Sequence, residues 1–336
     1  MADETQAAPP SRWQDLYQRP LVDLGERFGE KLRGIYSPGY DEALVRQYVQ
    51  KQFLEDASTY AGKYQNTDHF HWLITNALAK TALKSGTPDL RILDIGSGAG
   101  NSIVPLMQLF PDSLVIASDF SIELLALLQR ATGGASAERR CALLQLNAEE
   151  LEFRDNTFDL VVGAAILHHL FSPEKAVEGC SRILKPGGIA MFFEPFENGN
   201  MLLRMVYQQI LDRPLRRLPE EVGRILGALI RDFDLRRGRD KSAPIFRTVD
   251  DKWLFTLSYF RELADRYGFS SCRVHPLYET TQQFRKQTEA YLRLAGGLAP
   301  AAMPTWAWDL VDSYDQRFSE ECKADFLIEG CVILQK

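Results

Sequence analysis

Glycine occupies every second position of a short turn between a predicted buried strand and a predicted helix. The strand runs from Arg91 to Ile95, and Gly96, Gly98 and Gly100 follow it. Glycine permits a tight turn and lets the backbone approach a ligand closely, where a Cβ atom would intrude. The pattern therefore indicates either a ligand-binding loop or an ordinary strand-to-helix turn, and by itself it does not separate the two.

Polar residues at the ends of the next two predicted strands favour the ligand-binding interpretation. Asp119 ends the second strand, where a carboxylate can accept hydrogen bonds from both hydroxyls of a ribose. Asn147 follows the third strand and can offer its side-chain oxygen to the amine of an adenine, while Ala148 can offer a backbone N–H to a ring nitrogen. Asp119 could instead cap a helix, and Asn147 could be a turn residue. Three suitable strand ends are less probable by chance than one, so an adenosine-bearing ligand is favoured.

His168, His169 and Glu194 are the candidates for chemistry on a second molecule. The histidines follow the fourth predicted strand and Glu194 ends the fifth. His168 could be a general base or could orient an acceptor group, since the ordinary histidine pKa near 6.5 leaves a neutral fraction at cellular pH. Adjacent residues in a helical turn point about 100° apart, so both rings are unlikely to face the acceptor, and His169 is the one expected to be structural. Glu194 could orient a substrate amine or hydroxyl. Equally, the imidazoles could only tie their loop to a helix, and Glu194 could cap a loop.

Short apolar runs alternate with amphipathic stretches from residue 91 onward, and this alternation predicts the fold. The expected strands are 91–95, 114–118, 142–146, 159–162, 189–194, 271–278 and 326–334. Strands separated by single helices run parallel with right-handed crossovers. We therefore expect an α/β fold with a doubly wound, mostly parallel seven-stranded sheet, helices on both faces, and a ligand crevice at the carboxyl ends of the strands.

Helical patterns outside this core predict one domain with large insertions. Residues 1–85 are expected to be a helical N-terminal extension, with one helical pattern from Leu16 to Tyr36, and residues 86–196 the cofactor-binding core. Residues 197–250 read as a helical insertion, and 251–336 as the rest of the core sheet with a second helical insertion at 279–325. The inserted helices could form a lid over the crevice. Their aromatic side chains favour a core under these helices, or a homodimer interface, over contacts with a ring-bearing substrate.

In their order and spacing, the core motifs resemble those of the class I, Rossmann-like, S-adenosylmethionine-dependent methyltransferases. The resemblance is to the small-molecule branch that is similar to quinone and sterol methyltransferases, and it covers residues 91–194. It rests on the segments Leu93–Gly100, Asp119–Ser121, Asn147–Leu151, Phe158–Val162, Leu167–Leu170 and Arg182–Gly188. The resemblance implies S-adenosyl-L-methionine as the cofactor and S-adenosyl-L-homocysteine as the product.

The resemblance also implies roles for individual residues around the cofactor. The methionine part would be held by Asp94, Gly96, Ser97, Gly98 and Gly100, the ribose by Asp119, and the adenine by Phe120, Asn147 and Ala148. Asn147 stands where the family more often has aspartate, but its amide oxygen keeps the acceptor. Gly163 on the fourth strand completes the core set. Tyr64, before the core, could place its ring near the sulfonium, although packing between helices is slightly preferred.

The function that follows is methyl transfer to a hydroxyl, amine or carbon of a small molecule, such as a biosynthetic or secondary metabolite. We expect it to be metal-independent, because a divalent-cation methyltransferase would have carboxylates after the fourth strand, where this chain has 163–166, Gly-Ala-Ala-Ile. One alternative is a repurposed member that binds S-adenosylmethionine without transferring its methyl group. Another is an NAD-dependent oxidoreductase, which is disfavoured because the third glycine of its fingerprint would fall on Asn101.

Composition and charge limit the partners. The 39 basic and 45 acidic residues give a net charge of −6, which argues against nucleic acid as a substrate. Five scattered cysteines without a C-x-x-C pair predict reduced thiols in a cytoplasmic protein. No apolar run approaches the roughly eighteen residues of a membrane span. The expected partners are a small-molecule substrate and, in a homodimer, a second copy of the chain.

A basic cluster in the first insertion gives a separate hypothesis. Its members are Arg213, Arg216, Arg217, Arg224, Arg231, Arg236, Arg237, Arg239 and Lys241. They could bind a phosphate or carboxylate of the substrate. Interleaved acidic residues favour a solvated helix face instead.

Overall fold

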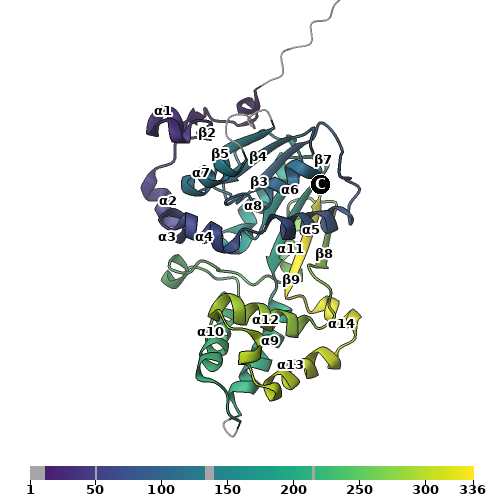
Figure 1. Cartoon of the computed structure of the whole chain (residues 1–336). Coiled ribbons are helices and arrows are strands. Elements are labelled where there is room, and N and C mark those ends of the chain that lie inside the picture. The colour runs from purple at the N-terminus through teal and green to yellow at the C-terminus, as the bar shows by residue number, and fades with distance from the viewer. Residues whose placement is uncertain (1–11, 50, 133–139, 214–215) are drawn as a thin grey trace, which may run out of the picture. The chain divides into compact units, whose positions relative to one another are not determined.

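The computed structural model describes residues 12–49, 51–132, 140–213 and 216–336 (Figure 1). The chain splits into two compact units, which are described separately. Unit 1 takes the described residues within Met1–Ala164, together with Glu174–Ala190 and Gln335–Lys336. Unit 2 takes Ala165–Pro173 and Met191–Leu334.

The strands form one nine-stranded sheet in the order β1-β2-β5-β4-β3-β6-β7-β9-β8. Their bounds are β1 Val22–Asp23, β2 Ile35–Ser37, β3 Arg91–Ile95, β4 Leu114–Asp119, β5 Cys141–Gln145, β6 Phe158–Ala164, β7 Leu184–Pro195, β8 Ser271–Pro276 and β9 Glu329–Gln335. β3 pairs in parallel with β4 on one side and with β6 on the other, and β4 pairs in parallel with β5. The central strands are buried along most of their length, as expected for a parallel sheet covered on both faces.

The predicted number of seven strands is wrong, because the N-terminal extension adds two. All seven expected strands are present as β3 to β9, and β2 adds in parallel to the outer side of β5, with Ile35 opposite Leu143. β1 then pairs antiparallel with β2. The stretch from Leu16 to Tyr36, expected to be one helix, contains β1, the short helix Leu24–Phe28, a 3₁₀ turn at Glu30–Leu32 and the start of β2. Strands of two or three residues are too short to show a period-two pattern, and the added pair covers what would be an open sheet edge.

Helices of unit 1 pack on this sheet and on each other. Their bounds are α1 Leu24–Phe28, α2 Glu42–Tyr48, α3 Lys51–Leu54, α4 Ala57–Tyr64, α5 Thr67–Leu78, α6 Ile103–Leu109, α7 Ile122–Ala131 and α8 Pro173–Ile183, the last of which begins in unit 2. The helix α7 contacts β4 and β5, and α6 contacts β4. The N-terminal helices α3 and α4 pack against α7, and α5 packs against α6. The N-terminal extension is therefore built onto the two helices that follow β3 and β4.

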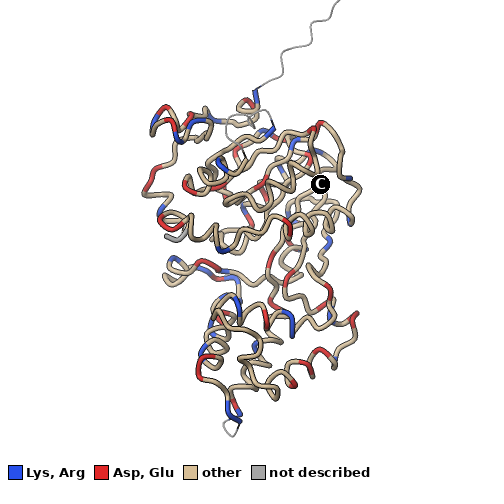
Figure 2. Tube along the Cα trace, in the orientation of Figure 1, with Lys and Arg blue, Asp and Glu red and all other residues tan. Residues whose placement is uncertain are grey.

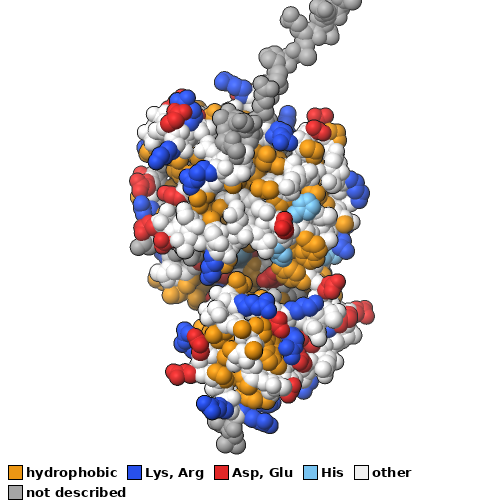
Figure 3. All heavy atoms as spheres, viewed as in Figure 1, with side chains coloured by type: hydrophobic (Ala, Val, Ile, Leu, Met, Phe, Trp, Pro, Cys, Tyr) orange, Lys and Arg blue, Asp and Glu red, His pale blue; other side chains and the backbone are white. Residues whose placement is uncertain are grey.

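Unit 2 has a hydrophobic core of its own between four helices. These are α9 Glu197–Leu211, α10 Glu220–Arg236, α12 Gln283–Gly296 and α13 Thr305–Arg317 (Figure 1). Contacts run from α9 to α10, from α10 to α12, from α12 to α13 and from α13 back to α9. The core includes Leu203, Tyr207, Phe233, Phe284 and Val311, all fully buried. Figure 3 shows further hydrophobic side chains on the outer face of this unit, mixed with charged ones. The helical insertion expected at 197–250 contains both α9 and α10.

Unit 2 also holds shorter elements, one of which carries His168 and His169. They include the 3₁₀ turn η4 Leu167–His169, α11 Leu257–Arg266 and α14 Glu320–Asp325. Among the described residues, no helix is long and apolar enough to cross a membrane.

Candidate functional site

The glycine loop has the backbone that its sequence predicts. Gly96, Gly98 and Gly100 all have positive φ, at 70°, 53° and 107°, a region that side chains other than glycine rarely adopt. A Cβ added to Gly98 would meet nothing within 4 Å, whereas one added to Gly100 would lie 2.7 Å from Cδ1 of Leu128. Gly98 therefore leaves space that a ligand could use, and Gly100 permits close packing of the loop on α7.

Asp94 lies in β3 beneath this loop and is completely buried. The Ser102 hydroxyl donates to its Oδ2 at 2.8 Å, while Oδ1 has no hydrogen-bond partner among the described residues. Burial raises the pKa of this carboxyl to about 7, and the negative charge of Asp119 raises it further, against the hydrogen bonds from Ser97 and Ser102. A buried carboxylate with an unused acceptor fits a cationic group such as the ammonium of S-adenosylmethionine.

Asp119 connects the end of β4 to the glycine loop. Its Oδ2 accepts a hydrogen bond from the Gly98 N–H at 2.9 Å, and its Oδ1 accepts one from the Ser121 N–H at 2.8 Å. An ionised carboxylate accepts hydrogen bonds and donates none, which suits it to ribose hydroxyls. Asp119 and Gly98, assigned separately from the sequence, are thus in direct contact.

The residues expected to read adenine also lie together. The Phe120 ring has its centroid 4.9 Å from that of Tyr40 in an edge-to-face arrangement, and the Tyr40 hydroxyl accepts a hydrogen bond from the Asn147 N–H at 3.2 Å. The side-chain oxygen of Asn147 accepts the Glu149 N–H at 3.0 Å, and Ala148 is buried. Asn147 therefore has the turn geometry that was its alternative interpretation, and its oxygen keeps one further acceptor position.

Three other predicted residues are engaged with the protein itself. The Ser97 hydroxyl donates to the Asp94 carbonyl at 3.1 Å and accepts the Ser118 N–H at 3.0 Å. Gly163 lies within β6 and is buried. Tyr64 is 39% exposed and packs against Tyr60 of the same helix, α4, with ring centroids 4.9 Å apart.

Asn101 links the N-terminal extension to the glycine loop. Its side-chain N–H donates to the Tyr64 carbonyl at 3.1 Å, and its side-chain oxygen accepts the Asn66 N–H at 2.8 Å. A single amide thus closes two backbone hydrogen bonds of the turn between α4 and α5. Neither Asn101 nor Tyr40 was identified from the sequence as a site residue, because contacts across 35 to 107 residues leave no local pattern to detect.

His168 and Glu194 form a tight pair in unit 2. The His168 Nδ1–H donates to Glu194 Oε2 at 2.6 Å, and the same carboxylate accepts the N–H groups of Ile166, Leu167 and His168 at 3.1, 2.8 and 3.2 Å. Glu194 is 1% exposed. Its oxygens are thus occupied by four protein donors, so its contacts fit a residue that positions His168 rather than one that touches a substrate.

The charge state of His168 differs from the one expected from the sequence. Burial by itself would lower the pKa of the imidazole, but the negative charges of Glu194 and Asp251 outweigh it and raise the pKa to about 10. Without a ligand, His168 is therefore protonated at cellular pH, and the neutral fraction assumed from an ordinary pKa is absent.

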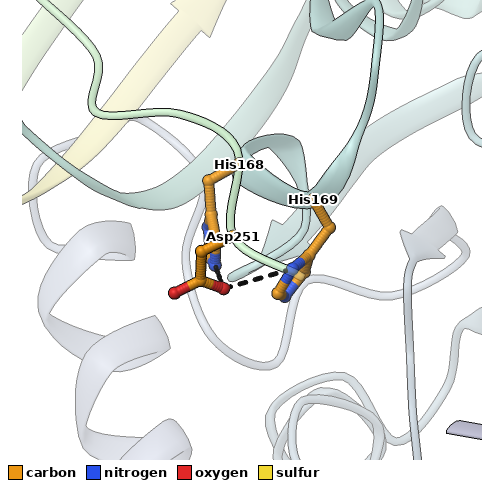
Figure 4. Close-up of side chains that lie close together, drawn as sticks. All are labelled: His168, His169 and Asp251. Atoms are coloured by element: carbon orange, nitrogen blue, oxygen red, sulfur yellow. Dashed lines mark ion pairs between the residues drawn. The ribbon is translucent and has the colours of Figure 1, made fainter. Parts of the chain in front are cut away.

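Both histidine rings point toward one carboxylate, contrary to the expectation that neighbours in a turn diverge (Figure 4). His168 Nε2 and His169 Nδ1 each lie 3.4 Å from Oδ1 of Asp251, and the two ring centroids are 4.1 Å apart. His169 Nδ1 also lies 3.1 Å from Oδ1 of Asp250. The other oxygen of Asp251 lies 3.3 Å from the guanidinium of Arg236. Asp251 follows Glu194 by more than fifty residues in a loop, and no sequence signal identified it.

The basic cluster of the first insertion is extensively paired. Figure 2 shows basic and acidic residues alternating along α10 and the segment after it. Ion pairs join Arg224 to Glu221, Arg236 to Asp232, Arg237 to Glu197 and Arg239 to Glu262. This pattern agrees with the solvated, self-paired face that the interleaved acids predicted. Arg236 and Lys241 differ from the others, because both are buried.

The predicted site residues therefore fall into two groups. Unit 1 brings together the glycine loop, Asp94, Asp119, Phe120 and Asn147, and unit 2 brings together His168 and Glu194.

Comparison with known proteins supports the same assignment of the core. Residues 93–192 match the model of a family described as "Methyltransferase domain". The chain is 31% identical over 125 residues to demethylmenaquinone methyltransferase of Thermus thermophilus, covering 36% of this chain and 56% of that protein. It is also 31% identical over 134 residues to a tRNA N(3)-methylcytidine methyltransferase of Drosophila melanogaster, covering 36% of this chain and 40% of the relative. The chain thus spans about half the length of such relatives.

Two solved structures share the fold. One is phosphoethanolamine N-methyltransferase 2 of Haemonchus contortus with phosphomonomethylethanolamine and S-adenosylhomocysteine, at 17% identity and a TM-score of 0.50, covering 89% of this chain and 60% of that one. The other is a complex between the Haloferax volcanii Trm112 methyltransferase activator and a methyltransferase, at 16% identity and a TM-score of 0.51, covering 85% and 96%. The comparisons therefore support the resemblance of residues 93–192, which hold the glycine loop, Asp94 and Asp119, to class I, S-adenosylmethionine-dependent methyltransferases.

Proposed function

We propose that this protein transfers the methyl group of S-adenosylmethionine to a hydroxyl, amine or carbon of a small molecule. The observation that carries the proposal is the assembly around the glycine loop, in which Asp119 bonds the Gly98 N–H and the buried Asp94 keeps an unsatisfied acceptor. Bound S-adenosylmethionine supplies an electrophilic methyl group on a sulfonium. Asp94 and the loop would bind its methionine part, Asp119 its ribose, and Phe120 with Asn147 its adenine.

In this proposal His168 orients the acceptor, because an imidazole that already carries its proton cannot take another, and Glu194 is the positioning residue. The hydrogen bond to Glu194 fixes Nδ1 as a donor, so Nε2 is the ring atom that remains for another molecule. The Glu194 carboxylate also holds the backbone of the η4 turn, which limits movement of the ring. An immobilised partner can lower a methyl-transfer barrier by alignment alone.

A small-molecule acceptor is supported by charge. The net charge of −6 gives no general attraction to a nucleic-acid backbone. By their names, one relative acts on a demethylated quinone and another on a cytidine of tRNA. The structural neighbour is bound to a phosphorylated ethanolamine. These three define the acceptor classes to compare.

The decisive experiment measures S-adenosylhomocysteine formation with purified protein and each acceptor class: a demethylated quinone, phosphoethanolamine and tRNA. We expect binding of S-adenosylmethionine by calorimetry and turnover with a small-molecule acceptor only. Turnover with tRNA alone would refute the small-molecule assignment. Binding of S-adenosylmethionine with no product from any acceptor would favour a repurposed, non-methylating protein. Binding of NAD in its place would overturn the proposal as a whole.

A further inference from the structure

His168, His169 and Asp251 offer three metal-ligand atoms that converge on one point. One atom from each residue lies within 4.8 Å of the others, which is close enough to surround a single ion (Figure 4). All three residues belong to unit 2, so their arrangement is fixed within one compact body. Two imidazoles and one carboxylate are a common ligand set for Zn²⁺ and other divalent transition metals.

The distances within this group fit metal coordination better than hydrogen bonding. A charge-assisted N–H···O bond is about 2.7–2.9 Å long, and the His168 to Glu194 contact, at 2.6 Å, is of that kind. The two contacts from the imidazoles to Asp251 Oδ1 are both 3.4 Å. Zn²⁺ lies about 2.0–2.1 Å from its ligands, and tetrahedral geometry then separates neighbouring ligand atoms by about 3.3–3.4 Å. We propose that His168 Nε2, His169 Nδ1 and Asp251 Oδ1 bind a divalent transition-metal ion such as Zn²⁺.

Two of the three proposed ligands have an outer partner that holds them in place. The His168 Nδ1–H is bonded to Glu194, so a metal ion would displace the proton from Nε2, the atom that faces Asp251. Asp251 presents Oδ1 to the histidines while Oδ2 lies 3.3 Å from Arg236. Carboxylates that orient a ligating histidine are a regular feature of metal sites, and their loss typically weakens metal binding about 10- to 100-fold.

The surrounding charge also favours a cation. Four carboxylates lie around the histidines or their partners, those of Glu194, Asp232, Asp250 and Asp251. Two cations are in the same network. Arg236 contacts Asp232 and Asp251, and the ammonium of Lys252 bonds the carbonyls of Val249 and Asp250. Once a metal ion has displaced the proton of His168, these four negative and two positive charges leave an excess of two negative charges, which a divalent ion would balance.

The site has three protein ligands, so a fourth position would be open to an oxygen or nitrogen donor from water or a small molecule. The side chain of Asp251 is 40% exposed, which gives an ion access from solvent. This inference does not depend on methyl transfer, because metal binding is measured without cofactor or acceptor. A metal ion on His168 Nε2 would take the place of the acceptor at that atom, and it would depart from the expectation of a site without metal.

The test is titration of chelator-treated full-length protein with Zn²⁺ by calorimetry, and with Co²⁺ by visible absorption. The variants are His169→Ala, Asp251→Asn and Glu194→Gln. The controls His71→Ala, in α5, and Asp240→Asn, on the surface, remove the same groups elsewhere. Circular dichroism of every variant reports its folding.

We expect one Zn²⁺ per wild-type chain and the intense absorption of tetrahedral Co²⁺. His169→Ala and Asp251→Asn should each weaken binding at least tenfold and abolish the Co²⁺ spectrum, and Glu194→Gln should weaken it about 10- to 100-fold. The controls should bind as the wild type does. Asp251→Asn keeps the shape of a partly exposed side chain and is expected to fold, so it tests metal binding even if another variant fails to fold. Equal Zn²⁺ affinity of folded Asp251→Asn and wild type, or no stoichiometric binding by the wild type, would overturn the proposal.

Discussion

Replacing Asp94 with asparagine measures the cost of the charge buried beneath the glycine loop. The carboxyl is 0% exposed, and burial followed by repulsion from Asp119 raises its pKa from 3.8 to about 7. Each pH unit by which a pKa rises corresponds to about 1.4 kcal/mol, so the ionised form costs on the order of 4 kcal/mol in the folded protein.

The direction in which stability changes with pH follows from the protons bound by the folded and unfolded states. Between pH 3.8 and about 7 the folded protein keeps a proton on Asp94 that the unfolded chain releases. The free energy of unfolding contributed by this group is therefore complete below the lower value, falls by about 1.4 kcal/mol per pH unit through the window, and stays low above it. Asparagine does not titrate, so its contribution to the free energy of unfolding does not fall over this pH range. The stability of Asp94→Asn relative to wild type should thus improve by about 3 kcal/mol between pH 5 and pH 8.

Comparing the two proteins across pH separates the effect of the charge, which depends on pH, from the effect of the changed hydrogen bonds, which does not. Asparagine keeps the acceptor for the Ser102 hydroxyl but places an N–H₂ group where Asp94 Oδ1 has no partner among the described residues. That unsatisfied donor costs about 1–3 kcal/mol at every pH.

The assay is urea unfolding of both proteins at pH 5, 6, 7 and 8, with exposed Asp112→Asn as the control. A stability difference that is the same at pH 5 and pH 8 would refute the account of Asp94 as a buried, charge-destabilised carboxyl.

Three further outcomes are expected. Asp119→Ala should weaken S-adenosylmethionine binding by about 1.5–3 kcal/mol, as for hydrogen bonds to a charged group, and an unchanged dissociation constant by calorimetry would assign Asp119 a structural role alone. Gly100→Ala should destabilise the protein by about 1–3 kcal/mol in thermal unfolding, because of its φ of 107° and the 2.7 Å approach to Leu128; an unaltered midpoint would contradict this. His168→Ala should reduce methyl transfer at saturating cofactor more than His169→Ala does, with cofactor binding preserved in both, and full turnover of a folded His168→Ala protein would disprove the role of its imidazole.

The sequence predicts the core of this fold well because its signals are local. Each strand from β3 to β9 is an apolar run bounded by turn or helix signals, and the glycines between β3 and α6 have the positive φ that only their type adopts readily. The contact between Asp119 and Gly98 was foreseeable for a related reason. The carboxyl ends of neighbouring parallel strands meet at one edge of the sheet.

The parts of the site that the sequence did not predict depend on contacts between residues far apart in the chain. Tyr40 reaches Asn147 across about a hundred residues, and Asp251 reaches His168 across about eighty. Neither Tyr40 nor Asp251 belongs to a sequence motif that would identify it. The charge state of His168 was also beyond the sequence, because a pKa is set by the groups that surround a side chain and not by its type alone.

The pairing of β2 with β5 has a consequence for how the chain folds during synthesis. Ile35 pairs with Leu143, so β2 is made 108 residues before its partner strand. At about 5–20 residues per second, the ribosome leaves this segment waiting roughly 5–20 s. Closing so long a loop costs entropy before any contact repays it. The N-terminal strands should therefore join the sheet late, after the β3–β4–β5 core has formed, and pulse-labelling hydrogen exchange during refolding should show their amides protected last.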